Sequence, residues 1–157
     1  MALRYGPPLD RLLQGFKFHQ RLASGRLLSR ILADAVLHDD APLPDCLIPV
    51  PLHPRRLRQR GFNQAAVIAN DLGCWLQRPV AAHCLRRVRH TPAQSGLSLD
   101  QRQRNLRRAF VAQGPLPAHV ALIDDVITTT STVRACAREL AAAGARRIDV
   151  WALARTP

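Results

Sequence analysis

The stretch HVALIDDVITTTSTVRACAREL (residues 119–140) combines an apolar run, two adjacent carboxylates, a row of hydroxyl side chains and a helical pattern. Residues 119–124 predict a buried strand, and residues 132–145 predict a helix that ends near Gly144. The carboxylates and the hydroxyls therefore stand at a strand-to-helix turn. In an α/β sheet such a turn lies at the carboxyl edge of the strands, where ligands bind.

Strands alternate with helices along the rest of the chain, which predicts an α/β fold with a mainly parallel central sheet flanked by helices. The expected helices cover residues 8–18, 21–38, 62–77 and 132–145, and the expected strands cover residues 45–52, 79–88, 119–124 and 146–155. In the second helix one apolar side is expected, made of Leu27, Leu28, Ile31, Leu32, Ala35 and Val36. Residues 53–64 predict a basic loop, and we expect one domain over residues 1–157.

Residues 89–110 (RHTPAQSGLSLDQRQRNLRRAF) are long, polar and basic, without a sustained apolar face. A polar stretch of this length inside a compact domain is typical of a functional lid or of a disordered segment. We expect a flexible lid, with residues 90–104 poorly ordered when no ligand is bound.

The composition fits one globular domain with affinity for anions. The chain has 157 residues, 47% of them hydrophobic, and a formal net charge of +12. Lys17 is the only lysine, so arginine carries most of the positive charge. A bias towards arginine and alanine in the genome explains much of that total, yet the excess still predicts attraction to nucleic acids or phosphorylated metabolites.

The cysteines and the hydropathy pattern indicate a cytoplasmic protein. Cys46, Cys74, Cys84 and Cys136 form no C-x-x-C pair, so the spacing predicts neither a zinc site nor a disulfide framework. Free cysteines of this kind fit a reducing compartment. No apolar run reaches the roughly 18 residues of a membrane span, so membrane insertion is not expected.

The turn after residue 123 has the chemistry of a sugar-phosphate site. A helix N-terminus presents unpaired N–H groups that favour phosphate, and hydroxyl side chains add donors. The carboxylates of Asp124 and Asp125 accept hydrogen bonds from sugar hydroxyls or hold Mg²⁺. A ribose 5-phosphate unit satisfies both halves. The alternative is structural: Thr130 or Ser131 caps the helix, and the two aspartates are solvated.

Three stretches carry a family resemblance. VALIDDVITTTST (120–132) resembles the phosphoribosyl-pyrophosphate (PRPP) binding motif of type I phosphoribosyltransferases. IPVPLHPRRLRQRGFNQA (48–65) and RVRHTPAQSGLSLDQRQRNLRRAF (87–110) are similar to segments of the ComF family, which includes the GntX-like members. ComF proteins are phosphoribosyltransferase-like and are associated with DNA uptake during bacterial competence. The resemblance runs from about residue 5 to the C-terminus and implies a type I phosphoribosyltransferase-like fold.

The resemblance implies a role for each matching position. Asp124 and Asp125 would be the catalytic pair that contacts the ribose hydroxyls, one of them through Mg²⁺. The 5-phosphate loop would be Thr128, Thr129, Thr130, Ser131 and Thr132; the pyrophosphate site Pro51, Arg55, Arg58 and Arg60; the lid contacts Arg89, Thr91 and Gln94. The arginines of the pyrophosphate site have an equally simple alternative as a solvated basic loop.

Two departures from the family stand out. Members usually have Gly where this chain has Thr130, and many begin with a cysteine-rich zinc-binding segment that does not occur in this sequence. This chain is expected either to be a short member or to lack the family's N-terminus, and no zinc site is expected in it.

Two functions follow from these observations. The first is PRPP and Mg²⁺ binding, with transfer of the phosphoribosyl group to an acceptor that no motif specifies. The alternative is a non-catalytic basic module that binds single-stranded DNA or a protein of the competence machinery. The scarcity of aromatic residues, 4% of the chain, disfavours a base-stacking platform in that second case. The sequence leaves the oligomeric state open.

Overall fold

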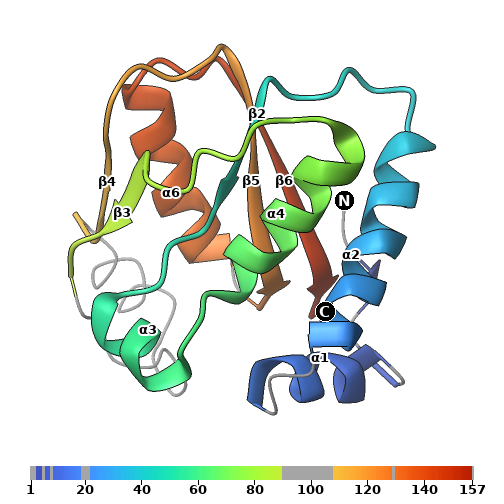
Figure 1. The fold of residues 1–157 in the computed structure, drawn as a ribbon. Coiled ribbons are helices and arrows are strands. Elements are labelled where there is room, and N and C mark those ends of the chain that lie inside the picture. The colour runs from blue at the N-terminus through green and yellow to red at the C-terminus, as the bar shows by residue number, and fades with distance from the viewer. Residues whose placement is uncertain are drawn as a thin grey trace.

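The structure, a computed structural model, describes residues 3–4, 6–7, 9–18, 22–89, 108–128 and 130–156. Figure 1 shows helices and strands in alternation around a central sheet. The strands are β1 (Leu3–Arg4), β2 (Cys46–Pro49), β3 (Leu85–Arg87), β4 (Phe110–Ala112), β5 (His119–Ile127) and β6 (Arg147–Arg155). The helices are α1 (Leu9–Phe18), α2 (Leu22–Leu37), α3 (Pro54–Arg60), α4 (Gln64–Leu76) and α6 (Thr130–Ala142).

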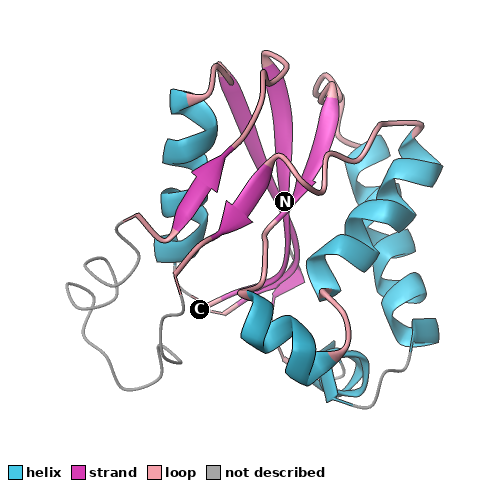
Figure 2. Cartoon of the chain, turned by 60° about the vertical axis from the view of Figure 1, so that its left-hand side comes forward, coloured by secondary structure: helices cyan, strands magenta, loops and turns pink. Residues whose placement is uncertain are grey.

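The central sheet is parallel, with strand order β1-β6-β5-β2. Both faces are covered by helices, as Figure 2 shows. The central strands are accordingly apolar without alternation: every residue of β2 is buried, and so are residues 120–123 of β5. The predicted α/β fold with a mainly parallel sheet is confirmed.

Each face of the sheet has its own hydrophobic cluster. On one face α1, α2 and α4 pack with Leu47, Ile123 and Leu153, and on the other α6 packs with Ile48, Leu122 and the second sheet. Both tryptophans contribute to apolar packing: Trp151 is buried, and Trp75 packs against the first cluster. No helix in the described ranges is long and apolar enough to cross a membrane.

The expected apolar side of α2 is partly wrong. Leu28, Leu32 and Val36 are buried as expected, but Leu27 is 53% exposed and Ile31 is 40% exposed. Helical periodicity alone does not say how wide a stripe the neighbouring elements cover, and here Ala33 and Ser29 take up part of the buried face instead.

The strand expected over residues 79–88 is divided between two sheets. Val80 forms an isolated parallel bridge to Leu47 on the outer side of β2, while residues 85–87 form β3. β3 pairs with β4 in a separate antiparallel sheet of two strands. The short strands β1 and β4 were not predicted, because two or three residues carry too little periodicity to be recognised.

The basic loop predicted over residues 53–64 is wrong in its first half, which forms helix α3. The side chain of His53 caps the helix by accepting from the N–H of Arg55 at 3.2 Å, and Pro54 occupies its first turn. The helix ends at Gly61, whose φ of 79° is a left-handed conformation that favours glycine. The cap, the proline and the glycine are each typical of a helix end. The many arginines between them nevertheless led to the prediction of a basic loop.

Candidate functional site

A crevice is expected between the carboxyl ends of β2 and β5. The chain leaves β2 through α4 and returns at Val80 on one side, whereas it leaves β5 through α6 and returns as β6 on the other side. Because crossovers of this kind are right-handed, the two helices lie on opposite faces of the sheet. The point where the chain changes direction is where open α/β sheets bind ligands.

The acidic pair stands where β2 has ended but β5 continues. The ladder between β2 and β5 stops at the pair Pro49–Ile123, while β5 goes on pairing with β6 as far as Ile127. The expectation that Asp124 ends its strand is therefore wrong. At this position it is β2 that ends, whereas β5 continues beyond Asp124 beside β6. Asp124 and Asp125 are half-buried at the resulting step.

Local hydrogen bonds orient both carboxylates. Oδ1 of Asp124 accepts from the N–H of Asp125 at 2.8 Å, and Oδ1 of Asp125 accepts from the N–H of Val126 at 2.6 Å. Successive side chains of a regular strand point to opposite faces, so the pleat gives the two residues different surroundings. Asp124 lies on the side of α6, because Leu122, two residues before it on β5, packs with α6.

The hydroxyl loop, the predicted 5-phosphate loop of residues 128–132, spans the start of α6, because the helix already begins at Thr130. Thr128 and Thr130 are exposed and Thr132 is half-buried, but Ser131 is buried; Thr129 lies outside the described residues. Thr130 is the first residue of α6, where an ordinary helical backbone is expected and not the positive φ that would favour Gly. The structure thus brings three of the five predicted residues to a position that solvent reaches, at the positive end of a 13-residue helix.

Thr156 fixes this loop and was missed from the sequence. Its N–H donates to the carbonyl of Ile127 at 3.0 Å, and its hydroxyl donates to the carbonyl of Thr128 at 3.2 Å. The two bonds hold the end of β5 just before the turn. No motif marks a threonine near the C-terminus for this task, so only the tertiary structure identifies it.

The predicted pyrophosphate residues lie on the other side of the crevice, on α3 and the segment before it. Pro51 is half-buried, while Arg55 and Arg58 are exposed. Arg60 is half-buried and donates to Oε1 of Gln64 at 3.2 Å. Arg56, four residues before Arg60, shares its helix face and is also half-buried.

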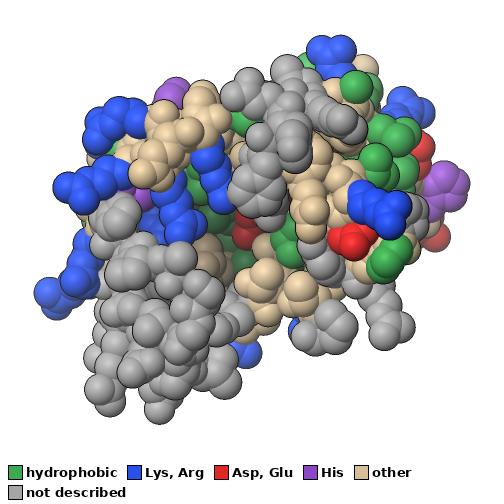
Figure 3. Space-filling view, turned by 90° about the horizontal axis from the view of Figure 1, so that it is seen from below, with side chains coloured by type: hydrophobic (Ala, Val, Ile, Leu, Met, Phe, Trp, Pro, Cys, Tyr) green, Lys and Arg blue, Asp and Glu red, His purple; other side chains and the backbone are tan. Residues whose placement is uncertain are grey.

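Arg87 on β3 adds an arginine that the sequence did not single out. Its guanidinium lies 5.4 Å from the ring centroid of Phe110, and the side chain is half-buried. Burial lowers the pKa of Arg87, and the nearby positive charge of Arg56 lowers it further. Figure 3 shows Lys and Arg side chains gathered on the side of the molecule that α3 and β3 occupy.

The predicted lid falls almost entirely on residues that the structure does not describe. Arg89 is described and exposed, whereas Thr91 and Gln94 lie outside the described residues, as does the expected disorder of residues 90–104. The described part places the lid's two ends on β3 and β4. The lid roles therefore stay predictions.

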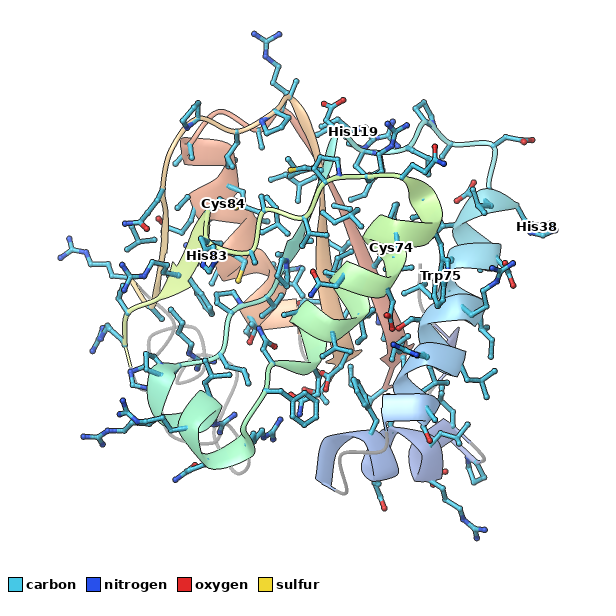
Figure 4. All side chains as sticks on the ribbon, viewed as in Figure 1. His38, Cys74, Trp75, His83, Cys84 and His119 are labelled. Carbon is cyan, nitrogen blue, oxygen red and sulfur yellow. The ribbon has the colours of Figure 1, made fainter. Side chains whose placement is uncertain are left out.

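The opposite edge of the sheet holds a different set of polar groups. His119 at the start of β5 lies there, as Figure 4 shows, and a small pocket of about 180 Å³ is lined there by Asp39, Arg147, Asp149 and Trp151 together with apolar residues. Across the residues that the structure describes, no three His, Cys, Asp or Glu side chains group as a metal site. Two carboxylates can still hold a Mg²⁺ whose remaining ligands come from phosphate oxygens and water.

Known proteins align with most of this sequence at about 40% identity. Competence protein F from Haemophilus influenzae is 41% identical over 159 residues, which cover 96% of this chain and 69% of that protein. The chain belongs to the competence protein F (ComF) family. The DNA utilization protein YhgH of Escherichia coli K12 is 40% identical over 157 residues, covering 97% of this ComF-family chain and 69% of YhgH. No protein-family model matches the chain.

Among solved structures, the purine phosphoribosyltransferase from Pyrococcus horikoshii Ot3 aligns with this ComF-family chain at 14% sequence identity and a TM-score of 0.48. The alignment covers 98% of this chain and 87% of that one.

Proposed function

We propose that this ComF-family chain binds PRPP in the crevice between β2 and β5 and serves DNA uptake during competence. The observation that carries the proposal is the step in the sheet, where Asp124 and Asp125 stand directly before the hydroxyl loop and the N-terminus of α6. The names of its relatives, competence protein F and DNA utilization protein, support the biological role. The unpaired cysteines, which are typical of a reducing compartment, support action in the cytoplasm.

Each part of the crevice would hold one part of PRPP. The N–H groups at the start of α6 and the hydroxyls of Thr128 and Thr130 would bind the 5-phosphate, because the helix end favours anions. The carboxylates of Asp124 and Asp125 would accept from the ribose hydroxyls. The arginines of α3 would neutralise the diphosphate, which is the leaving group of a transfer reaction.

In a transfer reaction, a bond forms between the acceptor and the anomeric carbon while the bond from that carbon to the diphosphate oxygen breaks. Mg²⁺, when bound with PRPP, supplies charge that stabilises the departing diphosphate. The lid would exclude water, which otherwise takes the place of the acceptor.

Calorimetric titration tests the binding step. PRPP with Mg²⁺ is titrated into the wild-type protein, and ribose 5-phosphate and pyrophosphate are titrated separately. We expect PRPP to bind more tightly than either fragment, because it contacts both sides of the crevice. If PRPP does not bind, the proposal is wrong. A crystal soaked with PRPP and Mg²⁺ would place each group.

Single-stranded DNA is the second candidate ligand. It is favoured by the exposed arginines that α3 shares with the β3–β4 region: Arg55, Arg58, Arg86, Arg89 and Arg108. Affinity that comes from phosphate contacts falls steeply as salt rises. A titration with a fluorescent oligonucleotide at several salt concentrations, with and without saturating PRPP, distinguishes a DNA-only module from a PRPP-binding protein that also binds DNA.

A further inference from the structure

Gln64, the first residue of α4, has an amide nitrogen that is buried and unpartnered. The residue is 2% exposed, and its Nε2 atom has no hydrogen-bond partner among the described residues. Its Oε1 atom accepts from Arg60 at 3.2 Å. An amide with one satisfied end and one unsatisfied end costs stability in the free protein, so a fold retains it more readily where a ligand completes it.

The start of α4, which carries this amide, lies at the edge of the crevice. The side chain of Asn63 donates from Nδ2 to the carbonyl of Val50 at 3.1 Å, and the N–H of Val50 donates to the carbonyl of Ile123 at 2.8 Å. The start of α4 is therefore tied to the end of β2, one strand away from the acidic pair. The helix end contributes a positive field, and Arg60 contributes a full positive charge beside the amide.

We propose that Nε2 of Gln64 donates a hydrogen bond to the diphosphate group of the ligand, beside the guanidinium of Arg60. The inference rests on the proposed function, since it names which part of PRPP the start of α4 contacts. Because the nitrogen is covered in the free protein, a ligand reaches it only after a neighbouring side chain moves. Arg60 is the neighbour that an anion attracts, and it already touches the same amide.

Two substitutions separate the donor from its purely structural role. Gln64→Met removes both the donor and the acceptor for Arg60, whereas Gln64→Glu keeps an acceptor for Arg60 and removes the donor. Gln59→Met is the matched control, because Gln59 is exposed on α3 next to Arg60. For each protein the affinities for PRPP with Mg²⁺ and for ribose 5-phosphate are measured, together with the melting temperature without ligand.

We expect both Gln64 variants to bind PRPP about tenfold more weakly or worse, with ribose 5-phosphate affinity unchanged. Gln64→Met should melt no lower than the wild type, since it removes an unsatisfied buried donor. If Gln64→Met does not fold, Gln64→Glu alone decides. PRPP affinity retained in Gln64→Glu would show that Gln64 only positions Arg60 and would overturn the inference, while the proposed function would stand because the wild type still binds PRPP.

Discussion

Nε2 of His119 lies 2.8 Å from Oδ2 of Asp149 at the amino edge of the sheet. This contact joins the beginning of β5 to the beginning of β6. Arg147 donates to the same carboxylate from Nε at 3.2 Å. Burial alone would raise the pKa of Asp149, but the hydrogen bonds from His119 and Arg147 outweigh it and hold that pKa below its ordinary value.

The pairing of Asp149 predicts a pH-dependent contribution to stability. A carboxyl with a lowered pKa in the folded state stabilises the fold above its unfolded pKa of about 3.9, and that stability is lost as the pH falls through the folded pKa. Asp149→Asn should therefore destabilise the protein by up to about 1 kcal/mol at neutral pH, and by less as the pH approaches about 3. Urea unfolding across this pH range measures it.

A suitable control is Asp34→Asn. Asp34 pairs with Arg30 on α2, where both side chains are about half exposed, so its loss should matter little at any pH. Equal pH profiles for the two variants would contradict the role given to Asp149.

The acidic pair should matter for ligand and little for folding. Asp124→Asn with Asp125→Asn keeps the shape of both side chains and their acceptor oxygens for the backbone N–H groups, so the free energy of unfolding should change by about 1 kcal/mol or less. Affinity for PRPP with Mg²⁺ should fall at least about tenfold, because hydrogen bonds to charged groups are the stronger ones.

Calorimetry on this double variant and on Asp39→Asn, an exposed aspartate near the opposite edge, checks the prediction. Unchanged PRPP affinity in the double variant would remove the ribose role from both residues.

The hydroxyl loop gives a third prediction at Thr130, where the motif that this stretch resembles is expected to have Gly. Thr130 is exposed and begins α6. Thr130→Gly should preserve or tighten PRPP binding, and it should cost about 0.5–1 kcal/mol of stability through the greater freedom of glycine in the unfolded chain. A large loss of affinity in a folded Thr130→Gly protein would mean that the threonine side chain itself holds the phosphate.

Sequence patterns predicted the layers of this fold well because its central strands are buried on both faces. Continuous apolar runs such as residues 120–123 then mark strands, and amphipathic runs such as residues 64–76 mark helices. They failed where the outcome depends on a neighbour. How far β5 runs beyond Asp124 is decided by β6, and how exposed Leu27 is depends on what covers α2.

The candidate site divides in the same way. The acidic pair and the start of α6 are local features of one continuous segment, so their sequence placed them together. Further site residues come from three other segments: Gln64, Arg87 and Thr156. Their contacts are visible only in the tertiary structure, and those contacts are what identify them as part of the site. Helix α3 was missed because its cap signals lie among arginines that also suit a loop.

The four cysteines should react at very different rates. All are free thiols, but only Cys74 is exposed. Burial raises the pKa of Cys84 to about 11, and burial also raises the pKa values of Cys46 and Cys136. Because the thiolate is the reactive form, one fast reaction with a thiol reagent is expected near pH 8 in the native protein. Cys74→Ser should abolish that fast phase, and a fast phase that persists would contradict the burial pattern.

Asn63 connects the start of α4 to the end of β2, and its substitution should lower the free energy of unfolding markedly. Its Oδ1 caps the helix by accepting from the N–H of Ala65 at 3.1 Å, and its Nδ2 donates to the carbonyl of Val50 at 3.1 Å. Asn63→Ala loses both bonds and should destabilise the fold by about 2–3 kcal/mol, as the sum of a lost cap and a lost tertiary hydrogen bond. Asn63→Asp keeps the cap and loses only the donor, so its stability should lie between that of Asn63→Ala and that of the wild type.

Asn70→Ala, a substitution of an exposed asparagine within the same helix, is the matched control and should change stability by less than about 0.5 kcal/mol. Urea unfolding of the four proteins gives the order, and PRPP titration adds the functional consequence: Asn63→Asp should bind PRPP more weakly than the wild type, because the start of α4 is no longer held at the crevice. If Asn63→Asp were as stable and bound as tightly as the wild type, the bond to Val50 would not position this helix.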